Sequence, residues 1–516
     1  MDTLDSRIHH WRASDRRLTL LCSVVIAVVL LFTYLPLFFA QYGFGDDFVL
    51  FTSRGNLERA FLADGRTVFA LAQYLVHRNI QSIAQLGGIR LLTGIGVAIV
   101  AVCFYRLLRP LRFGHLERTA IAIALGTLPC MQTYVAQAMT WLSPYAALCS
   151  IAAATLTRDA FRGSATTRWP NRMRLLAAAA LMLLCSATYQ PMLAWYWSVV
   201  FLLLLDRRFT VSAMYRRRMT KVILLGCGYF LLCYLAFKLA FLVIDVPIKA
   251  RSELTRAPLY KLYWFLRIQL PQAMNFWRLM EVPNRITSLA IAGLAILVVL
   301  GGYVLACRRL CERPGFIQRM AAKTIVVWTA LLLCVFLWTH LHWLVIEGVP
   351  QSYRIIAPLG GTSLLLLVWS IRQWTLLIPC RERRITLCRG IFVSLAMLGA
   401  FSASLYNHKY WIGPHENAYR FLLHTVRTEV TPATQQIHII RQGQHDGLVP
   451  HSYIECFGRP AFERSWAIAD LVKSALSDSG IPHSVDRITS SAGDEPIPQQ
   501  SNVLVIDTRQ IVTYRM

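Results

Sequence analysis

Two adjacent carboxylates, Asp46 and Asp47, follow directly on the first long apolar segment of the chain. Ionisable groups beside a membrane-embedded segment are costly to keep there, which makes them candidates for function. One carboxylate could act as a general base that accepts the proton of an attacking hydroxyl, while the other orients that hydroxyl or a divalent cation. We take Asp47 as the first choice for the base. In the structural alternative, the pair caps a short helix by accepting hydrogen bonds from its free backbone N–H groups.

A second group of polar residues could bind a phosphate or a sugar. Arginine binds phosphate through parallel N–H groups, lysine binds it as a point charge, and tyrosine and glutamine can hydrogen-bond to hydroxyls. The alternative for each residue is structural: a turn, packing between helices, or a long cationic side chain that reaches the lipid headgroups. The residues are Arg66, Tyr189, Gln190, Lys249, Arg251 and Arg354.

Three residues of the third apolar region suit an acceptor sugar. Tyr134, Gln137 and Trp141 combine an amide with aromatic rings, and a sugar ring could stack on the indole of Trp141. The alternative is an aromatic belt at the membrane surface, where tryptophan and tyrosine are enriched.

The histidines and cysteines do not show the spacing of a metal site. We therefore predict no metal and no cofactor, although the aspartate pair could hold a divalent cation. The sequence contains neither a GxSxG motif nor a P-loop, so a soluble hydrolase or NTPase has no support.

The elements that position these residues are apolar segments. Of the 516 residues, 56% are hydrophobic and 16% are charged, which is too apolar for an ordinary soluble protein. We predict an α-helical polytopic membrane protein with about eleven transmembrane helices, several of them shorter than the roughly 20 residues of a perpendicular span. The first segment lacks a cleavage pattern and is predicted to be retained. The predicted spans are Leu18–Ala40, Leu86–Leu108, Thr119–Ala138, Pro144–Thr157, Leu175–Ala187, Met192–Leu205, Val222–Ile244, Ile286–Ala306, Thr324–Val345, Ile355–Ile371 and Gly390–Tyr406.

The formal charge of +26 comes largely from clusters at the ends of apolar segments. This distribution does not predict nucleic-acid binding, which requires a basic face. If the segments are spans, all six clusters fall on one side, which the positive-inside rule identifies as the cytoplasm. The N-terminus is then cytoplasmic, and the aspartate pair and the C-terminus lie outside. The clusters are Arg7–Arg17, Arg106–Arg118, Arg158–Arg174, Arg207–Lys221, Arg308–Lys323 and Arg372–Arg389.

The chain divides into a membrane domain, residues 1–406, and an α/β domain outside the membrane, residues 407–516. Two large outside loops are predicted at 41–85 and 246–285, and the second alternates aromatic and cationic residues, as in helices among lipid headgroups. Patterning in the second domain predicts a helix from His415 to Val430, a strand at Gln436–Arg441, a helix at Glu463–Ser477, a loop at Ser490–Ser501 and a buried strand at Asn502–Asp507.

The chain resembles the bacterial membrane glucosyltransferases that modify O-antigen, within the GT-C class of polyprenyl-phosphate-sugar-dependent transferases. The resemblance rests on Asp46-Asp47 after the first span, on Gly65-Arg66 in the same loop, and on the Tyr189-Gln190-Pro191 break. It covers residues 1–210 by motif and the rest by topology, with an outside domain that is small for the class.

The resemblance implies a GT-C-like enzyme of the bacterial inner membrane. Such an enzyme moves a sugar, here glucose, from a polyprenyl phosphate to a surface glycan or lipid-linked acceptor on the periplasmic side. An acidic residue of the first outside loop would be its base, and its partners would be the donor, the acceptor and membrane lipids, without nucleic acid. Two other classes stay open: a polysaccharide or lipid-carrier transporter, and an O-antigen polymerase or ligase. A transporter would place ionisable groups at mid-span, whereas most here lie at the predicted outer boundary.

Overall fold

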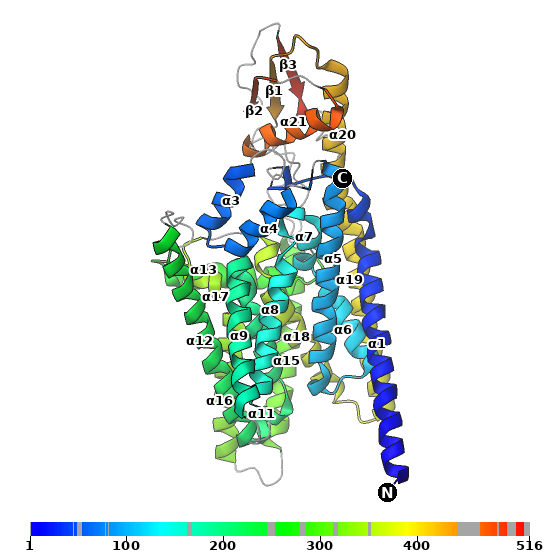
Figure 1. Cartoon of the computed structure of the whole chain (residues 1–516). Helices are drawn as coiled ribbons and strands as arrows, with labels where there is room; N and C mark the ends of the chain where they lie inside the picture. The colour runs from blue at the N-terminus through cyan, green and yellow to red at the C-terminus, as the bar shows by residue number, and fades with distance from the viewer. Residues whose placement is uncertain are drawn as a thin grey trace.

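The computed structural model shows a bundle of long helices with a small α/β appendage at one end (Figure 1). We call the described residues from 413 to 509 the appendage. The structure describes residues 2–44, 46–48, 54–77, 79–80, 82–161, 168–244, 253–278, 285–312, 318–348, 352–441, 465–481, 485–492 and 502–509.

The first half of the bundle forms from the apolar runs, because a helix satisfies its backbone hydrogen bonds within itself and so suits lipid. Prolines mark its breaks: Pro129 begins a helix bent by 57° from the preceding one. The helices are α1 (Asp2–Phe39), α3 (Arg54–Ala63), α4 (Thr67–His77), α5 (Leu86–Leu107), α6 (His115–Gly126), α7 (Pro129–Ala136), α8 (Ser143–Ala160), α9 (Arg168–Tyr189) and α10 (Trp195–Leu204), with 3₁₀ turns η1 (Ile83–Gln85), η2 (Arg109–Leu111), η3 (Ala138–Thr140) and η4 (Gln190–Ala194).

The second half adds further long helices and a set of short ones near the appendage. The helices are α11 (Arg207–Val211), α12 (Ala213–Ile244), α13 (Pro258–Trp264), α14 (Leu270–Met274), α15 (Arg285–Cys311), α16 (Gln318–Trp338), α17 (Leu341–Val345), α18 (Ala357–Thr375) and α19 (Arg381–Tyr406), with the 3₁₀ turn η7 (Tyr353–Ile355) and the π-helical turns η6 (Phe265–Gln269) and η8 (Asn407–Ile412).

A helix overlaps each of the eleven predicted spans, but the count of eleven is not confirmed. Among the described residues, seven helical segments are long and apolar enough to cross a membrane, or eight if the bent pair α6 and α7 is one span. Three of the predicted spans account for the difference. The apolar part of α16 is short, and α18 is not among the helices that are long and apolar enough to cross a membrane. Helices α9 and α10 form one helical segment, Pro170–Leu204, although Tyr189 between them has an extended backbone (φ −156°, ψ 98°).

The outward faces of the long helices are apolar. Phe32 of α1, Leu242 of α12 and Ile286 of α15 are 75%, 81% and 86% exposed. Faces of this kind are unusual on a soluble monomer and match the hydrocarbon of a bilayer. The helices therefore support the predicted membrane protein.

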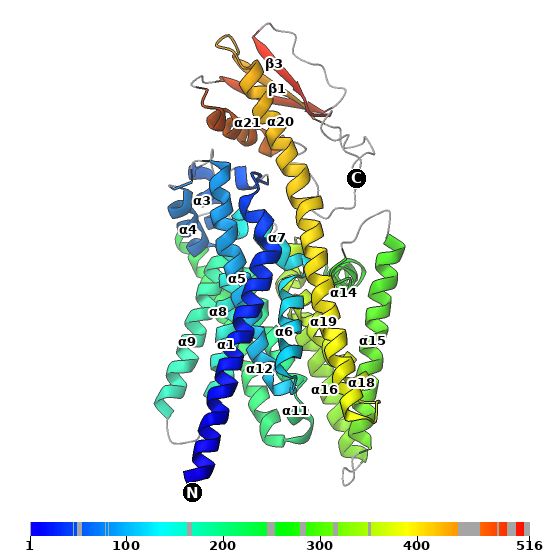
Figure 2. The same cartoon turned by 90° about the vertical axis from the view of Figure 1, so that its right-hand side faces the viewer.

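The basic clusters gather at the end of the bundle that is opposite to the appendage. Arg372, in the last turn of α18, donates hydrogen bonds to the carbonyl oxygens of Leu111 and Arg112 beyond α5. Arg109 pairs with Asp15 of α1 at 3.2 Å. The N-terminus and α11 lie at this same end in both views (Figures 1 and 2). This arrangement agrees with the prediction that the clusters share one side.

Both predicted helices and both predicted strands of the appendage form, but the strand at Val503–Asp507, which was predicted to be buried, is mostly only partly buried, and the strand at Arg487–Ala492 was not predicted. The appendage contains α20 (Gly413–Glu429), β1 (Gln436–Arg441), α21 (Ser465–Ser479), β2 (Arg487–Ala492) and β3 (Val503–Asp507). The three strands are parallel in the order β2-β1-β3, with Ile439 facing Ser490 on one side and Ile506 on the other. Ser490 therefore belongs to a strand and not to the predicted loop, and residues 493–501 of that loop lie outside the described part.

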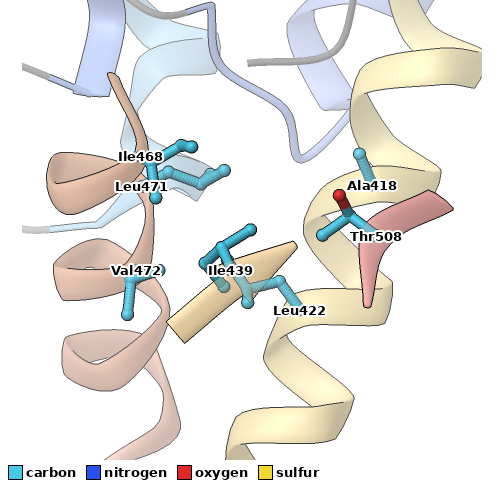
Figure 3. A pocket seen from close by; sticks show the side chains of 7 residues that line it. All are labelled: Ala418, Leu422, Ile439, Ile468, Leu471, Val472 and Thr508. Atoms are coloured by element: carbon cyan, nitrogen blue, oxygen red, sulfur yellow. The ribbon is translucent and has the colours of Figure 1, made fainter. Parts of the chain in front are cut away.

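The core of the appendage is closed. Figure 3 shows Ile439 of β1 between Ile468, Leu471 and Val472 of α21 and Leu422 of α20. The void among these side chains measures about 10 Å³, which holds one water molecule at most.

The membrane domain continues into the appendage without a linker. The helical segment Arg381–Glu429 runs through the predicted boundary at Tyr406. The appendage core also includes Phe48, Phe61 and Phe69 of the first loop. The appendage thus packs directly on the loop that carries the aspartate pair.

Candidate functional site

A cavity of about 890 Å³ lies beneath the first loop, at the appendage end of the bundle. Residues far apart in the sequence line it, and they divide into two chemical types. The polar residues are Asp46, Asp64, Arg66, Thr140, Ser143, Ser186, Tyr189, Gln190, His342 and Arg354. The apolar residues include Phe230, Leu231, Tyr234 and Phe237 of α12, Leu341 and Val345 of α17, and Leu254, Ile346 and Ile355.

Asp46 and Arg354 form an ion pair in the cavity wall. Their Oδ2 and Nη1 atoms are 3.4 Å apart, and their side chains remain 39% and 23% exposed. Arg354 lies in η7, where the Ser352 hydroxyl accepts a hydrogen bond from its backbone N–H at 3.3 Å. Both charged groups are thus placed by local structure and are open to a ligand.

Arg66 is held against the break between α9 and η4. Its Nε donates to Gln190 Oε1 at 3.4 Å, and Gln190 Nε2 donates to the Asp64 carbonyl at 2.8 Å. The guanidinium also lies 4.8 Å from the centroid of the Tyr189 ring, and it pairs with the Asp64 carboxylate at 3.8 Å. The structure therefore brings together four residues that the sequence indicated separately: Arg66, Tyr189, Gln190 and Arg354 all line the cavity with Asp46.

A glycine makes the Asp64–Arg66 turn possible. Gly65 has a φ of +72°, and a Cβ atom there would lie 2.4 Å from the ring of Phe237 on α12. Only glycine adopts this conformation without strain and also leaves room for that ring. Gly65 thus allows the turn to pack on the cavity wall.

Asp47 has a different environment from its neighbour. Its side chain is fully buried and is not part of the cavity lining. Its Oδ1 accepts a hydrogen bond from the Met139 N–H at 2.8 Å, and its Oδ2 accepts one from the Phe44 N–H at 3.1 Å. Arg90 Nη2 lies 3.9 Å from the same Oδ2. Of the pair, only Asp46 therefore lines the cavity, whereas Asp47 was our first choice for a base from the sequence.

The burial of Asp47 predicts a pH-dependent contribution to stability. Burial raises the pKa of this carboxyl from 3.8 to about 6, although Arg90 and the two backbone N–H groups oppose the shift. A raised pKa stabilises the folded state below about pH 4, and this contribution, at most about 3 kcal/mol, is lost as the pH rises through 6.

We expect Asp47→Asn to remove this dependence. The quantity to compare is the thermal unfolding midpoint of the variant minus that of the wild type. This difference should be more positive at about pH 7.5 than at about pH 5, because only the wild type loses stability as the pH rises. Unfolding in detergent at both pH values measures the difference. A midpoint difference that does not change with pH would contradict the raised pKa.

Tyr134 supports the cavity from behind and does not line it. Its side chain is 1% exposed, and its hydroxyl donates to the carbonyl oxygen of Arg354. The predicted contact between Tyr134 and an acceptor is therefore not what the structure shows. Tyr134 instead connects α7 to η7.

Gln137 and Trp141 are also not part of the cavity lining. Gln137 is 3% exposed, and Trp141 packs on the apolar core shared by the first loop and the appendage. Thr140, between them, does line the cavity. Of the three predicted acceptor residues near the turn η3, Tyr134 and Gln137 are buried, and Trp141 is partly buried against that core.

Two predicted phosphate ligands, Lys249 and Arg251, lie outside the described residues. Sequence reasoning did not find several residues that the structure places at the site. His342 and the apolar residues of α12 line the cavity, and the fully buried Arg90 lies beside Asp47. For Arg90, the available signal in the sequence was an arginine within the apolar segment Leu86–Leu108, because a charge in such a segment needs several partners.

The carboxylates of the cavity do not form a metal site of the usual kind. Among the described residues, no group of three or more histidines, cysteines, aspartates and glutamates could hold a metal ion. Asp46 and Asp64 each face an arginine instead. The predicted possibility of a divalent cation thus gains no support from this geometry.

The sequence was compared with models of known protein families and with curated proteins, and neither comparison found a match.

Proposed function

We propose that this protein is a membrane glycosyltransferase with a GT-C-like fold that moves one sugar from a polyprenyl-phosphate donor to a hydroxyl of a surface glycan, such as O-antigen. Glucose is the expected sugar. One observation carries the proposal: the exposed Asp46 carboxylate lies 3.4 Å from the Arg354 guanidinium in a cavity that also has an apolar wall.

The polar part of the cavity suits a sugar phosphate. Arg354 and Arg66 are exposed to the cavity and could bind the oxygens of a phosphate, which arginine recognises through parallel N–H groups. Gln190 and Tyr189 hold Arg66 and add polar atoms of their own. Both cations line the same cavity as the carboxylate that would act as base.

The apolar part of the cavity suits a hydrocarbon chain. Leu231 and Tyr234 of α12 line the cavity and are 58% and 40% exposed, so they give it an open apolar wall. In a membrane the outward face of α12 meets lipid tails. A polyprenyl chain could therefore stay in the bilayer while its phosphate occupies the polar part.

The proposed reaction is a single displacement with inversion. Asp46 takes the proton of the acceptor hydroxyl, whose oxygen attacks the anomeric carbon of the donor. The bond between that carbon and the phosphate oxygen breaks, and the lipid phosphate leaves with the electron pair. Arg354 and Arg66 stabilise the negative charge that grows on this phosphate. Arg354 would exchange its contact with Asp46 for the phosphate when the donor binds.

The position of the charges favours a transferase over a transporter. The charged residues that line the cavity, Asp46, Asp64, Arg66 and Arg354, belong to the short connecting segments at one end of the bundle. A transport path would carry ionisable groups near the middle of the spans. We further propose that the appendage end faces the periplasm of a bacterial inner membrane, with the basic end in the cytoplasm.

Transfer by purified protein tests the proposal. In detergent, with a polyprenyl-phosphate sugar and isolated glycan, we expect the product mass to rise by one sugar residue. Growth by whole repeat units would instead identify a polymerase or ligase. Movement of lipid-linked glycan that requires a sealed membrane, without any new bond, would identify a transporter. Mass spectrometry of surface glycan from cells with and without the protein identifies the sugar.

A further inference from the structure

All three guanidinium nitrogens of Arg90 donate hydrogen bonds inside the protein. The side chain is fully buried in α5. Its Nε donates to the Ala136 carbonyl at 3.1 Å, and its Nη1 donates to the carbonyls of Leu37 and Ala40 at 3.5 and 3.2 Å. Its Nη2 donates to the Tyr42 carbonyl, and the guanidinium stacks on the Tyr42 ring at 3.6 Å.

Two of these four carbonyls lie at helix ends. Leu37 lies in the last turn of α1, and Ala136 is the last residue of α7. Carbonyl groups at helix C-termini have no partner within the helix, and a cation there is favourable. Arg90 therefore ties the end of α1 to the end of α7.

Asp47 adds to the connection that Arg90 makes between α1 and α7, and we call the contacts of these two residues the bracket. Its carboxylate connects the loop after α1, through the Phe44 N–H, to the turn η3, through the Met139 N–H. The loop also makes a direct contact with α7, because the Tyr42 hydroxyl donates to the Ala136 carbonyl at 3.0 Å. The loop is thus fixed to α7 from several directions.

Helix α7 also supports the second charged group of the site. Tyr134, two residues before the Ala136 carbonyl, donates to the backbone carbonyl of Arg354. One short helix therefore sets the positions of both Asp46, which is adjacent to Asp47, and Arg354. The distance between the carboxylate and the guanidinium depends on this common support.

We infer that Arg90 and Asp47 are positioning residues, which act through α7 to hold Asp46 in line with the Arg354 phosphate site. The effect on catalysis rests on the proposed function, in which Asp46 is the base. Neither residue touches the substrate, so their loss should misplace the base without removing the groups that bind the donor. A misplacement of about 1 Å can cost roughly 100-fold in rate.

Kinetics of Arg90→Met, Arg90→Lys and Asp47→Asn test the inference. We expect kcat to fall by about 30- to 100-fold in Arg90→Met and Asp47→Asn, while KM for the donor changes by less than about threefold. Arg90→Lys, which keeps the charge and some donors, should recover part of kcat. Arg118→Met is the matched control, because Arg118 is 6% exposed in α6 and stacks on Tyr105. We expect it to keep kcat.

Hydrogen exchange of peptide 41–48 gives a measurement that does not depend on activity. We expect this peptide to lose protection in Arg90→Met and Asp47→Asn, with α8 and α9 still protected. Unchanged exchange and unchanged kcat in both variants would overturn the inference. Equal losses of kcat in Arg118→Met would also overturn it, because they would indicate a general loss of stability. A wild-type protein that transfers no sugar would instead refute the proposed function, while the exchange data would still decide whether the bracket holds the loop.

Discussion

Asp46→Asn is expected to lower sugar transfer by about 100- to 10,000-fold, the usual contribution of a general base. Asparagine has the same shape as aspartate but cannot accept the proton of the acceptor hydroxyl. The side chain is 39% exposed and contacts one arginine, so the change should leave folding and membrane insertion intact. The measurement is kcat with the purified variant, together with its yield from the membrane fraction.

Asp15→Asn is the matched control for this variant. Asp15 also pairs with an arginine, at 3.2 Å, and is 35% exposed, but it lies at the opposite end of the bundle. We expect wild-type transfer from it. Normal transfer by Asp46→Asn with none by Asp47→Asn would move the base to Asp47. Normal transfer by both single variants would refute the assignment of either aspartate.

Arg354→Gln should have the second-largest effect. We expect kcat/KM to fall by about 100- to 1,000-fold, as when one donor to a developing negative charge is removed. KM for the donor should rise, because the guanidinium would bind its phosphate in the ground state as well, while KM for the acceptor should stay near the wild-type value. Arg354→Lys should recover only part of the activity, since lysine lacks the planar pair of N–H groups.

Arg308→Gln controls for the loss of an arginine. Arg308 is 74% exposed and pairs with Glu312 one turn away, at the basic end of the bundle. Such exposed pairs contribute little, so we expect full activity. Equal losses in both variants would contradict a phosphate role for Arg354. A rise in KM for the acceptor alone would assign Arg354 to the other substrate.

Much of the cavity could be predicted from residue type and position. Asp46, Gln190 and Arg354 each stand beside a predicted apolar segment, where a polar side chain is costly without a function or a partner, and Arg66 lies in the same outside loop as Asp46. The direction of the apolar segments then placed them at the same end. The structure agrees, since all four line one cavity.

The roles of the two aspartates could not be predicted in this way. Asp46 and Asp47 are identical in type and adjacent in the chain, so no local pattern separates them. The difference arises from contacts with Met139 and Arg90, far along the chain, which bury one carboxylate and leave the other exposed. Similarly, Tyr134 and Trp141 have the composition of a sugar site, but Tyr134 is buried and Trp141 packs on the core shared by the first loop and the appendage.

The sequence by itself determined the apolar helices, the shared end of the basic clusters and two of the three strands of the appendage, because hydrophobic patterning and charge are local properties. The resemblance to membrane glucosyltransferases also came from short local motifs. Only the tertiary structure decided which polar side chains face the cavity and which support it. That choice depends on hydrogen bonds between helix ends, such as those from Arg90 to the carbonyls of Leu37 and Ala136, which no spacing in the sequence encodes.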